Sequence, residues 1–437
     1  MNVEVRNKQT AAERAACEQF AAVAGSLPGS GAVAAVRRRA MERFVAEGLP
    51  HRRIEEWKYT DLRAALRELP PLAAASDAPI GPDTLGEVDC WKIVVVDGGE
   101  PRLPKGLADE GVEVSRLSEA LADGALEGEW PEGTASAIFD LNTAFVSTGV
   151  VLRIPANVHV GKPIQIACVT TAPKAASVYL RNRIHVGAGG SATVMETYEG
   201  PDGVAYLVNA ATKLSADRDA GLTWVKVQRD GDKASHFATV AADVGQGARL
   251  TVAPFTTGAA LSRNQFAIAF SGRHSEANLA GVHLLGERQH GDTTLFVDHA
   301  LPDGASRELF KSVLDGEAHG VFQGKILVRQ DAQKTDGRMM TQALMLSERA
   351  EADNKPELEI YADDVQCGHG ATSGRIDEDL LFYLRARGIP EPTAKALLIE
   401  AFIGEAVEAI GNEAIAEALS ALAHDWVTQH ARQEQAR

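Results

Sequence analysis

The sequence predicts a mainly β protein: a β-solenoid core with an α-helical segment at each end. Three observations lead to this expectation. From about residue 150, short alternating strands follow one another with glycine between them and no convincing helix. An internal period of about 28 residues runs through the same region. Glycine is abundant, at 40 residues, whereas aromatic residues make up only 5%, which suits many tight turns around a narrow core.

Two series of residues carry the internal period. Alanines recur at steps of 27 to 29 residues and phenylalanines at steps of 26 to 30, namely Ala192, Ala220, Ala248, Ala277, Ala305 and Ala332, and Phe237, Phe266, Phe296 and Phe322. Chance spacing in an alanine-rich chain is the alternative explanation, and the second series argues against it. A strand-rich repeat of this length is typical of a solenoid in which each coil stacks on the one before.

Residues 1–70 are predicted to form an N-terminal helical domain, because apolar residues recur at helical spacing among alanine, arginine and glutamate. Glycine and proline divide it at Leu27–Gly31 and again at Gly48–Pro50. The following segment, 71–149, is interpreted as a linker with mixed α/β structure. Within it, Cys90–Asp97 has the pattern of one buried strand.

The predicted β-helix core spans 150–375, and 376–437 forms a C-terminal helical domain. This domain contains an apolar stripe with the spacing of one helix face, made of Ile399, Phe402, Ile403, Ala406, Val407 and Ile410. Two interpretations stay open. The stripe packs against the last coil or the next helix, or it is a docking surface for another protein, since the end of a solenoid needs a cap.

Charge and composition exclude several classes of protein. With 44 Lys and Arg against 60 Asp and Glu, the net charge is −16, so we expect no nucleic-acid partner. No apolar run approaches the length of a membrane-spanning helix, so we expect no membrane partner. Met1–Glu13 lacks the apolar stretch of a secretory signal, and four scattered cysteines form no C-x-x-C pair. These features favour a soluble, reduced, cytoplasmic protein.

Enzyme signatures are missing from the sequence. It contains no P-loop, so no nucleotide is expected to bind to this chain, and no G-x-S-x-G or H-E-x-x-H motif. Gly245-Gln246-Gly247 is half of a dinucleotide fingerprint, but strands flank it. Asp298 and His299 could act as an oriented base, although a surface histidine or a satisfied strand histidine is the better interpretation without a nucleophile motif. We therefore expect no enzyme; no flavin motif is seen, and flavin binding stays open.

One cluster, Asp363 to Thr372, combines ligand types. Cys367 and His369 are two residues apart, so on a strand they point to the same face. A thiolate with an imidazole suits iron, zinc or an iron–sulfur cluster. Two ligands do not complete a site, so the spacing alone leaves open a structural pair or a shell that a partner chain completes, and it favours the structural pair.

Two longer motifs resemble a known family. Residues 48–62 read GLPHRRIEEWKYTDL, similar to the N-terminal signature of the SufD branch of the SufB/SufD family. The run from Cys367 to Ile389, with C-x-H-G-A-T, then G-R-I, then L-F-Y-L-x-x-R-G-I, resembles the C-terminal signature of that family. Residues 333–336 and 354–360 match the same block. The resemblance covers essentially the whole chain, and the motifs together are highly specific.

The resemblance implies a right-handed parallel β-helix with helical terminal domains and a function in iron–sulfur cluster assembly. It implies a complex with SufB, joined through the β-helix cores, and with the ATPase SufC, docked on the C-terminal helices through Ile399, Phe402, Ile403, Ala406 and Val407. A homodimer of the chain alone is also compatible with it. On this basis His369 and, less directly, Cys367 become ligands of a transient cluster shared with SufB.

The same resemblance separates this chain from SufB. The equivalent stretch of SufB resembles His-Glu-Ala, whereas here Gly370 follows His369, and no motif marks Cys168 as a sulfur acceptor. The chain is therefore expected to be a non-enzymatic half of a scaffold, and the sulfur-receiving role to belong to the partner. The alternative is a purely structural adaptor for SufB and SufC without direct metal ligation.

Overall fold

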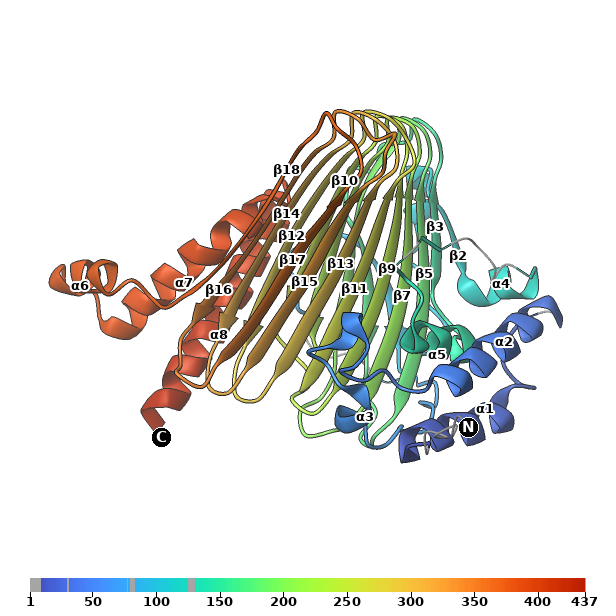
Figure 1. Cartoon of the computed structure of the whole chain (residues 1–437). Coiled ribbons are helices and arrows are strands. Elements are labelled where there is room, and N and C mark those ends of the chain that lie inside the picture. Colours follow the sequence, from blue (N-terminus) through green and yellow to red (C-terminus); the bar gives the residue numbers. More distant parts are fainter. Residues whose placement is uncertain are drawn as a thin grey trace, which may run out of the picture.

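The computed structural model describes residues 9–29, 31–76, 78, 83–124, 130–131 and 133–436. Its strands form two nine-stranded sheets that face each other along a solenoid (Figure 1). The strands of sheet 1 are β1 (Trp91–Val96), β4 (Ile164–Val169), β6 (Ser191–Glu199), β8 (Gly221–Arg229), β10 (Arg249–Thr256), β12 (Glu276–Leu285), β14 (Ala305–Leu314), β16 (Asp336–Met345) and β18 (Gln366–Gly374). Those of sheet 2 are β2 (Glu113–Arg116), β3 (Val150–Ile154), β5 (Ser177–Val186), β7 (Leu207–Ala216), β9 (Ser235–Val244), β11 (Leu261–Phe270), β13 (His290–His299), β15 (His319–Val328) and β17 (Glu351–Ile360).

Each coil contributes one strand to each sheet, and the coils stack in parallel register. Gly221 of β8 pairs with Arg249 of β10, 28 residues later, and the pairing continues in the same way along both sheets. The predicted parallel β-solenoid, with a period close to 28 residues, is confirmed. The phenylalanine series is not stacked, however: Phe266 pairs with Leu295, so Phe296 points to the opposite face.

The turns between coils are tight where one coil lies on the next. Gly247, in the turn before β10, has φ +65, and a Cβ there would lie 2.3 Å from Oδ1 of Asp219 in the coil below. Glycine adopts this left-handed backbone readily, and the equivalent position of the coil below is occupied by Asp219 with φ +58. Close stacking of the turns therefore favours glycine at Gly247, where a side chain would meet Asp219.

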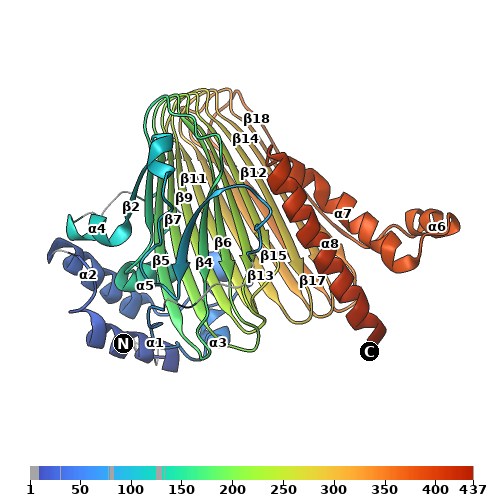
Figure 2. The same cartoon turned by 180° about the vertical axis from the view of Figure 1, so that it is seen from behind.

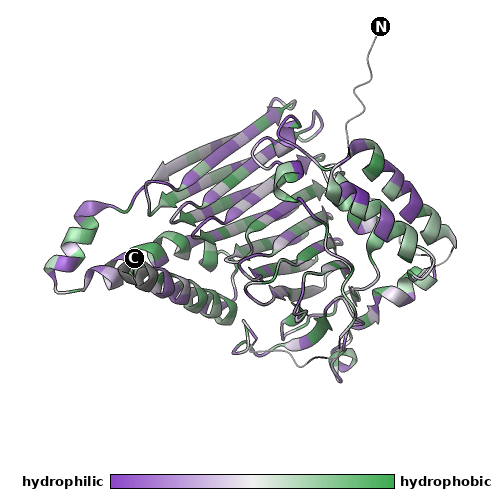
Figure 3. Cartoon of the chain, turned by 90° about the horizontal axis from the view of Figure 1, so that it is seen from below, coloured by the Kyte–Doolittle hydropathy of each residue, from purple (hydrophilic) through white to green (hydrophobic). Residues whose placement is uncertain are grey.

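The solenoid begins within segment 71–149, earlier in the chain than the predicted start at residue 150. β1 lies within the predicted strand Cys90–Asp97 and pairs in parallel with β4. β2 pairs with β3 and is the antiparallel strand at the start of sheet 2. Figure 3 shows the stacked coils from below, with polar and apolar residues interspersed along the strands.

The interior between the sheets is apolar at many positions but not at all of them. Alternate residues of each strand point inward, and the core cluster includes Trp224, Phe266 and Phe310. Register pairing also aligns polar residues in one inward row of sheet 1: Cys168, Tyr198, Gln228, Thr256 and His283. The core is therefore a stack of rows, some of them polar.

The N-terminal helices cover the outer face of sheet 2, on the side of the solenoid opposite the C-terminal helices (Figures 1 and 2). They are α1 (Ala11–Val23), α2 (Gly31–Glu47), α3 (Leu62–Ala65), α4 (Leu117–Ala122) and α5 (Ala137–Phe145), with the 3-10 turn η1 (Glu55–Trp57). A second 3-10 turn, η2 (Leu107–Glu110), instead packs Leu107 into the interior cluster. α1 begins at a capping box in which Thr10 and Glu13 satisfy each other's backbone N–H groups. Phe20 and Phe44 pack with Tyr179 and Phe237 of the sheet in one cluster.

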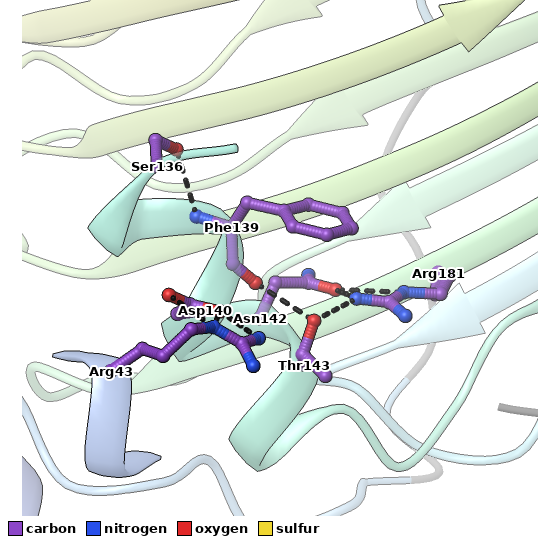
Figure 4. A network of polar contacts seen from close by, with 7 residues as sticks. All are labelled: Arg43, Ser136, Phe139, Asp140, Asn142, Thr143 and Arg181. Carbon is purple, nitrogen blue, oxygen red and sulfur yellow. Dashed lines mark hydrogen bonds and ion pairs between the residues drawn. The ribbon is translucent and has the colours of Figure 1, made fainter. Parts of the chain in front are cut away.

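A buried arginine joins α5 to sheet 2 (Figure 4). Arg181 donates to Oδ1 of Asn142 and to the Thr143 hydroxyl, at 2.8 Å each from Nη2. No carboxylate takes part in these bonds, and burial lowers the pKa of Arg181 to about 9. Arg43 of α2 pairs with Asp140, which also lies on α5, and its Nε is 3.0 Å from Oδ1 of Asp140. Polar contacts thus fix α5 between α2 and the sheet.

The C-terminal helices are α6 (Glu378–Ala386), α7 (Glu391–Glu408) and α8 (Glu413–Ala436). α7 and α8 lie against the outer face of sheet 1, with α7 crossing β12 and β14, whereas α6 projects away from the sheet (Figures 1 and 2). Among the stripe residues, Ile399, Ile403, Ala406 and Val407 are at most 3% exposed and pack with Val282 and other outward residues of sheet 1. The stripe is therefore a packing face in this chain and does not form an open surface.

Candidate metal-binding site at the end of the solenoid

The Cys367–His369 pair lies on β18, the strand that ends sheet 1. β18 pairs with β16 along one edge, with Cys367 opposite Gly337 and His369 opposite Met339. Because β18 ends the sheet order, its other edge has no neighbouring strand among the described residues. An open edge offers backbone N–H and C=O groups to another chain.

Both side chains lie on one face of β18, as the two-residue spacing predicted, and the register places that face toward the interior. Cys367 packs against the interior core cluster, and His369 shares a row with Met339, which belongs to that cluster. Cys367 is partly buried, whereas His369 is exposed. The difference arises at the last coil, where the interior of the solenoid opens.

The surroundings of Cys367 favour the protonated thiol. Burial raises the pKa of Cys367, a backbone hydrogen bond at Gly337 lowers it, and the carboxylates of Asp336 and Glu308 raise it further. A thiolate is the form that binds a metal. A cation at this position would therefore have to displace the thiol proton.

Glu308 on β14 was not predicted from the sequence. It is 2% exposed and points inward, in the same row of sheet 1 as Met339 and His369. Neither carboxylate oxygen has a hydrogen-bond partner in the described part of the chain. Burial raises the pKa of Glu308 to about 8, and Ser306 and Arg307 lower it only in part. No local motif marks this residue, because its environment comes from coils that are distant in sequence.

The other acidic and histidine candidates do not join this pair. Asp363 and Asp364 are exposed, and Asp364 forms an ion pair with Lys334. Asp298 pairs with Arg329 on the outer face, with Nη2 of the arginine 2.6 Å from Oδ2. His299 points inward, with Nε2 2.9 Å from the Ser306 hydroxyl. Asp298 and His299 thus have separate partners and do not form an oriented base, and His299 is satisfied only at Nε2, because its buried Nδ1 has no hydrogen-bond partner among the described residues.

Cys168 faces the interior near the opposite end of the solenoid, where burial raises its pKa well above the ordinary range. Across the described ranges, no three histidine, cysteine, aspartate or glutamate side chains converge closely enough to hold a metal ion. Cys367 and His369 are therefore an incomplete ligand set in the chain alone.

A groove of about 800 Å³ runs along the outer face of β14, β16 and β18, beside α7. Arg307 and Arg338 line it, and both bond to Asp336. Gly368 and Gly370 leave its floor without side chains. Cys367, His369 and Glu308 are also among the residues that line this groove, so it borders the Cys–His pair.

Residues 168–402 match the model of the SufBD core domain of the SUF system for FeS cluster assembly, and residues 27–69 match the SufBD N-terminal region. The first match spans more than half of the chain. The chain belongs to the SufB/SufD family. Within the family it resembles SufD, as the N-terminal signature indicated.

Relatives in three bacteria support the assignment. An iron–sulfur cluster assembly SufBD family protein of Synechocystis is 31% identical, covering 83% of this chain and 84% of the relative. The iron–sulfur cluster assembly protein SufD of Escherichia coli is 29% identical, covering 86% and 88%. A SufBD family protein of Mycobacterium tuberculosis is 30% identical, covering 85% and 88%. The family assigns this chain a role in iron–sulfur cluster assembly.

The N-terminal signature of the family has a structural explanation here. Trp57 of that motif is 5% exposed and stacks on Arg263 of sheet 2. Nη2 of Arg263 donates to the Glu56 carbonyl oxygen at 2.7 Å. The motif thus holds the N-terminal domain to the outer face of the solenoid. None of the described helices is both long and apolar enough to cross a membrane.

Proposed function

We propose that this chain is a non-enzymatic subunit of a cytoplasmic SufB–SufC–SufD scaffold, in which a nascent iron–sulfur cluster is built between this chain and SufB. The observation that carries the proposal is the position of Cys367 and His369. They share one face of the strand that ends sheet 1, where the interior opens. Iron and sulfide are the cargo of this site, and SufB supplies the remaining ligands.

The ends of the two sheets support pairing with SufB through the cores. β17 and β18 end sheets 2 and 1, and each has one strand neighbour among the described residues. Ile360 and Tyr361, at the end of β17, are 41% and 64% exposed. Unpaired parallel strands with exposed apolar side chains favour continuation by a second β-helix. The same edges would join two copies of this chain when SufB is absent.

The C-terminal helices support docking of SufC, on a different surface from the predicted stripe. Leu380, Phe382 and Tyr383 of α6 are 51%, 73% and 53% exposed, an apolar patch that we call the α6 surface. Phe402 is the partly buried member of the stripe. Because α7 packs on sheet 1, ATP-driven movement of SufC at the α6 surface would reach the core through α7.

The test is iron and acid-labile sulfide in the anaerobic complex co-expressed with SufB and SufC. We compare wild type with His369→Ala and Cys367→Ala at equal complex yield. His159→Ala, at an exposed position far from β18 in sequence, is the matched control. A large loss in His369→Ala with none in the control supports a shared ligand. Unchanged iron and sulfide in both site variants would contradict ligation and leave the adaptor function.

A further inference from the structure

The two strands that end the solenoid differ in how their free edges are built. β17 ends sheet 2 and β18 ends sheet 1, and each has a strand neighbour along one edge only among the described residues. A free edge carries backbone N–H and C=O groups that can pair with another chain, unless proline or charged side chains protect it. The protection of the two edges therefore indicates which sheet a partner can continue.

Backbone hydrogen bonds show which residues of β17 face its free edge. The N–H of Glu351 donates to the Ala318 carbonyl oxygen at 2.9 Å, on the side of β15. The N–H of Tyr361, directly after β17, donates to Val328 of β15 at 2.8 Å. Successive residues of a strand point their backbone groups to opposite edges. The odd-numbered residues of β17 therefore pair with β15, and the even-numbered residues face the free edge.

Pro356 lies at an even-numbered position in the middle of β17. Its missing N–H is therefore on the free edge, and its ring occupies the side from which another strand would approach. Half of the ten residues of β17 also carry a charge, namely Glu351, Asp353, Lys355, Glu357 and Glu359. Proline and charge are the usual means of preventing strand pairing at an edge. The edge of sheet 2 is thus protected at its centre.

β18 has neither kind of protection. The N–H of Gln366 donates to the Thr335 carbonyl oxygen at 2.8 Å, on the side of β16, so the odd-numbered residues of β18 face the free edge. All of them have an N–H group, because no proline occurs in this strand, and none of its nine residues is Asp, Glu, Lys or Arg. The backbone groups on the free edge belong to Cys367, His369, Ala371 and Ser373. The edge of sheet 1 is therefore open to pairing.

We propose that SufB pairs one strand of its core with β18 through main-chain hydrogen bonds and contacts β17 through side chains only. The inference rests on the proposed function, which places SufB at this end of the solenoid. An unprotected edge is stable against aggregation only when another strand covers it. Pairing with β18 also brings the SufB strand next to Cys367 and His369, since these residues supply free-edge backbone groups. Pro356 thus determines which of the two sheets is continued.

The first test is hydrogen exchange in the wild-type full chain, alone and in the complex with SufB and SufC. The chain alone is diluted until light scattering reports a monomer. We expect exchange of the odd-numbered amides of β18 to slow about tenfold or more in the complex, and the even-numbered amides of β17 to keep their rates. Equal slowing on both strands would overturn the proposal. Protection of β18 in a dimer of this chain, with none in the complex, would assign the edge to a second copy and also overturn it.

The second test places proline on each free edge in turn. Ala371→Pro removes an N–H from the free edge of β18, and Ala352→Pro, the matched control, removes one from the free edge of β17. Neither change removes a hydrogen bond to the neighbouring strand within the chain. We expect Ala371→Pro to weaken SufB binding about tenfold or more, because a carbonyl of SufB then lacks its donor, and Ala352→Pro to leave the affinity unchanged. Wild-type affinity in Ala371→Pro, or equal losses in the two variants, would contradict the proposal.

Melting curves of the free variants show whether each proline is tolerated by the fold. If Ala371→Pro melts well below wild type, the exchange experiment decides, because it uses the unmodified chain. Failure of the proposed function is a separate result, read from iron and sulfide in the complexes with His369→Ala and Cys367→Ala. Unchanged iron and sulfide there, with β18 protected by SufB, would remove the ligands and keep the strand pairing.

Discussion

The guanidinium carbon of Arg263 lies 3.8 Å from the centre of the Trp57 ring. Arg263 also pairs with Asp292, and the Thr60 hydroxyl donates to the same carboxylate. The side chains of Arg263 and Asp292 are 2% and 0% exposed. A cation between an aromatic face and a buried carboxylate thus attaches the N-terminal motif to sheet 2.

Trp57→Ala should detach the segment around η1 from sheet 2. The change removes a buried ring and one face of the Arg263 site, so we expect a loss of about 3–5 kcal/mol in the free energy of unfolding. Chemical denaturation measures the loss, and hydrogen exchange should show faster exchange in the N-terminal helices. Ile54→Ala, in the same segment but 38% exposed, should stay within about 0.5 kcal/mol of wild type. Equal effects of the two changes would contradict a specific role for Trp57.

Asp292→Ala should destabilise the folded protein as much as Arg263→Ala does, because either change leaves an uncompensated buried charge. Each should cost about 3–5 kcal/mol of folding free energy. Replacing both residues should cost less than the sum of the two single changes, since no lone charge then remains. A double-mutant cycle measures this coupling. Additive losses would show that the two groups do not act as a pair.

Glu308→Gln should change the pH dependence of stability in metal-free buffer. The pKa of Glu308 is raised from 4.5 to about 8, so the folded state holds its proton over a range in which the unfolded state loses it. Wild-type stability therefore falls as pH rises from about 4.5 to about 8, by up to about 1.4 kcal/mol per pKa unit. The variant should lack this loss, so its free energy of unfolding should increase relative to that of wild type as the pH rises from about 4.5 to about 8. Denaturation at pH 5 and pH 8 measures it, and parallel pH profiles would contradict it.

Phe382→Ser on the α6 surface should weaken SufC binding without affecting the fold. Phe382 is 73% exposed, so stability should change by no more than about 0.5 kcal/mol, whereas a hot-spot aromatic contributes about 2 kcal/mol or more to binding. Calorimetry with purified SufC measures the affinity. Ile403→Ala is the contrasting variant: it should cost about 2–5 kcal/mol of folding free energy, because Ile403 packs on sheet 1. Normal SufC affinity in Phe382→Ser would move the docking site elsewhere.

Much of the fold could be predicted because it is encoded locally. The repeat of about 28 residues, the alternation within strands and the helical ends each depend on neighbours in the chain, and the parallel solenoid followed from them. The pairing of Cys367 with His369 on one face also needed only the two-residue period of a strand. The number of strands in each coil could not be predicted, because the length of a repeat does not determine how the chain folds within it.

The amino-acid sequence by itself determined the solenoid, the family and the Cys–His pair. Only the tertiary structure decided that Glu308 lies in the row of His369, since that neighbour comes from a strand two coils earlier and depends on coil-to-coil register. It also decided that Ile399 and Ile403 are buried while Phe382 is exposed. An amphipathic pattern shows that a face is apolar, but the packing of whole elements determines what covers it.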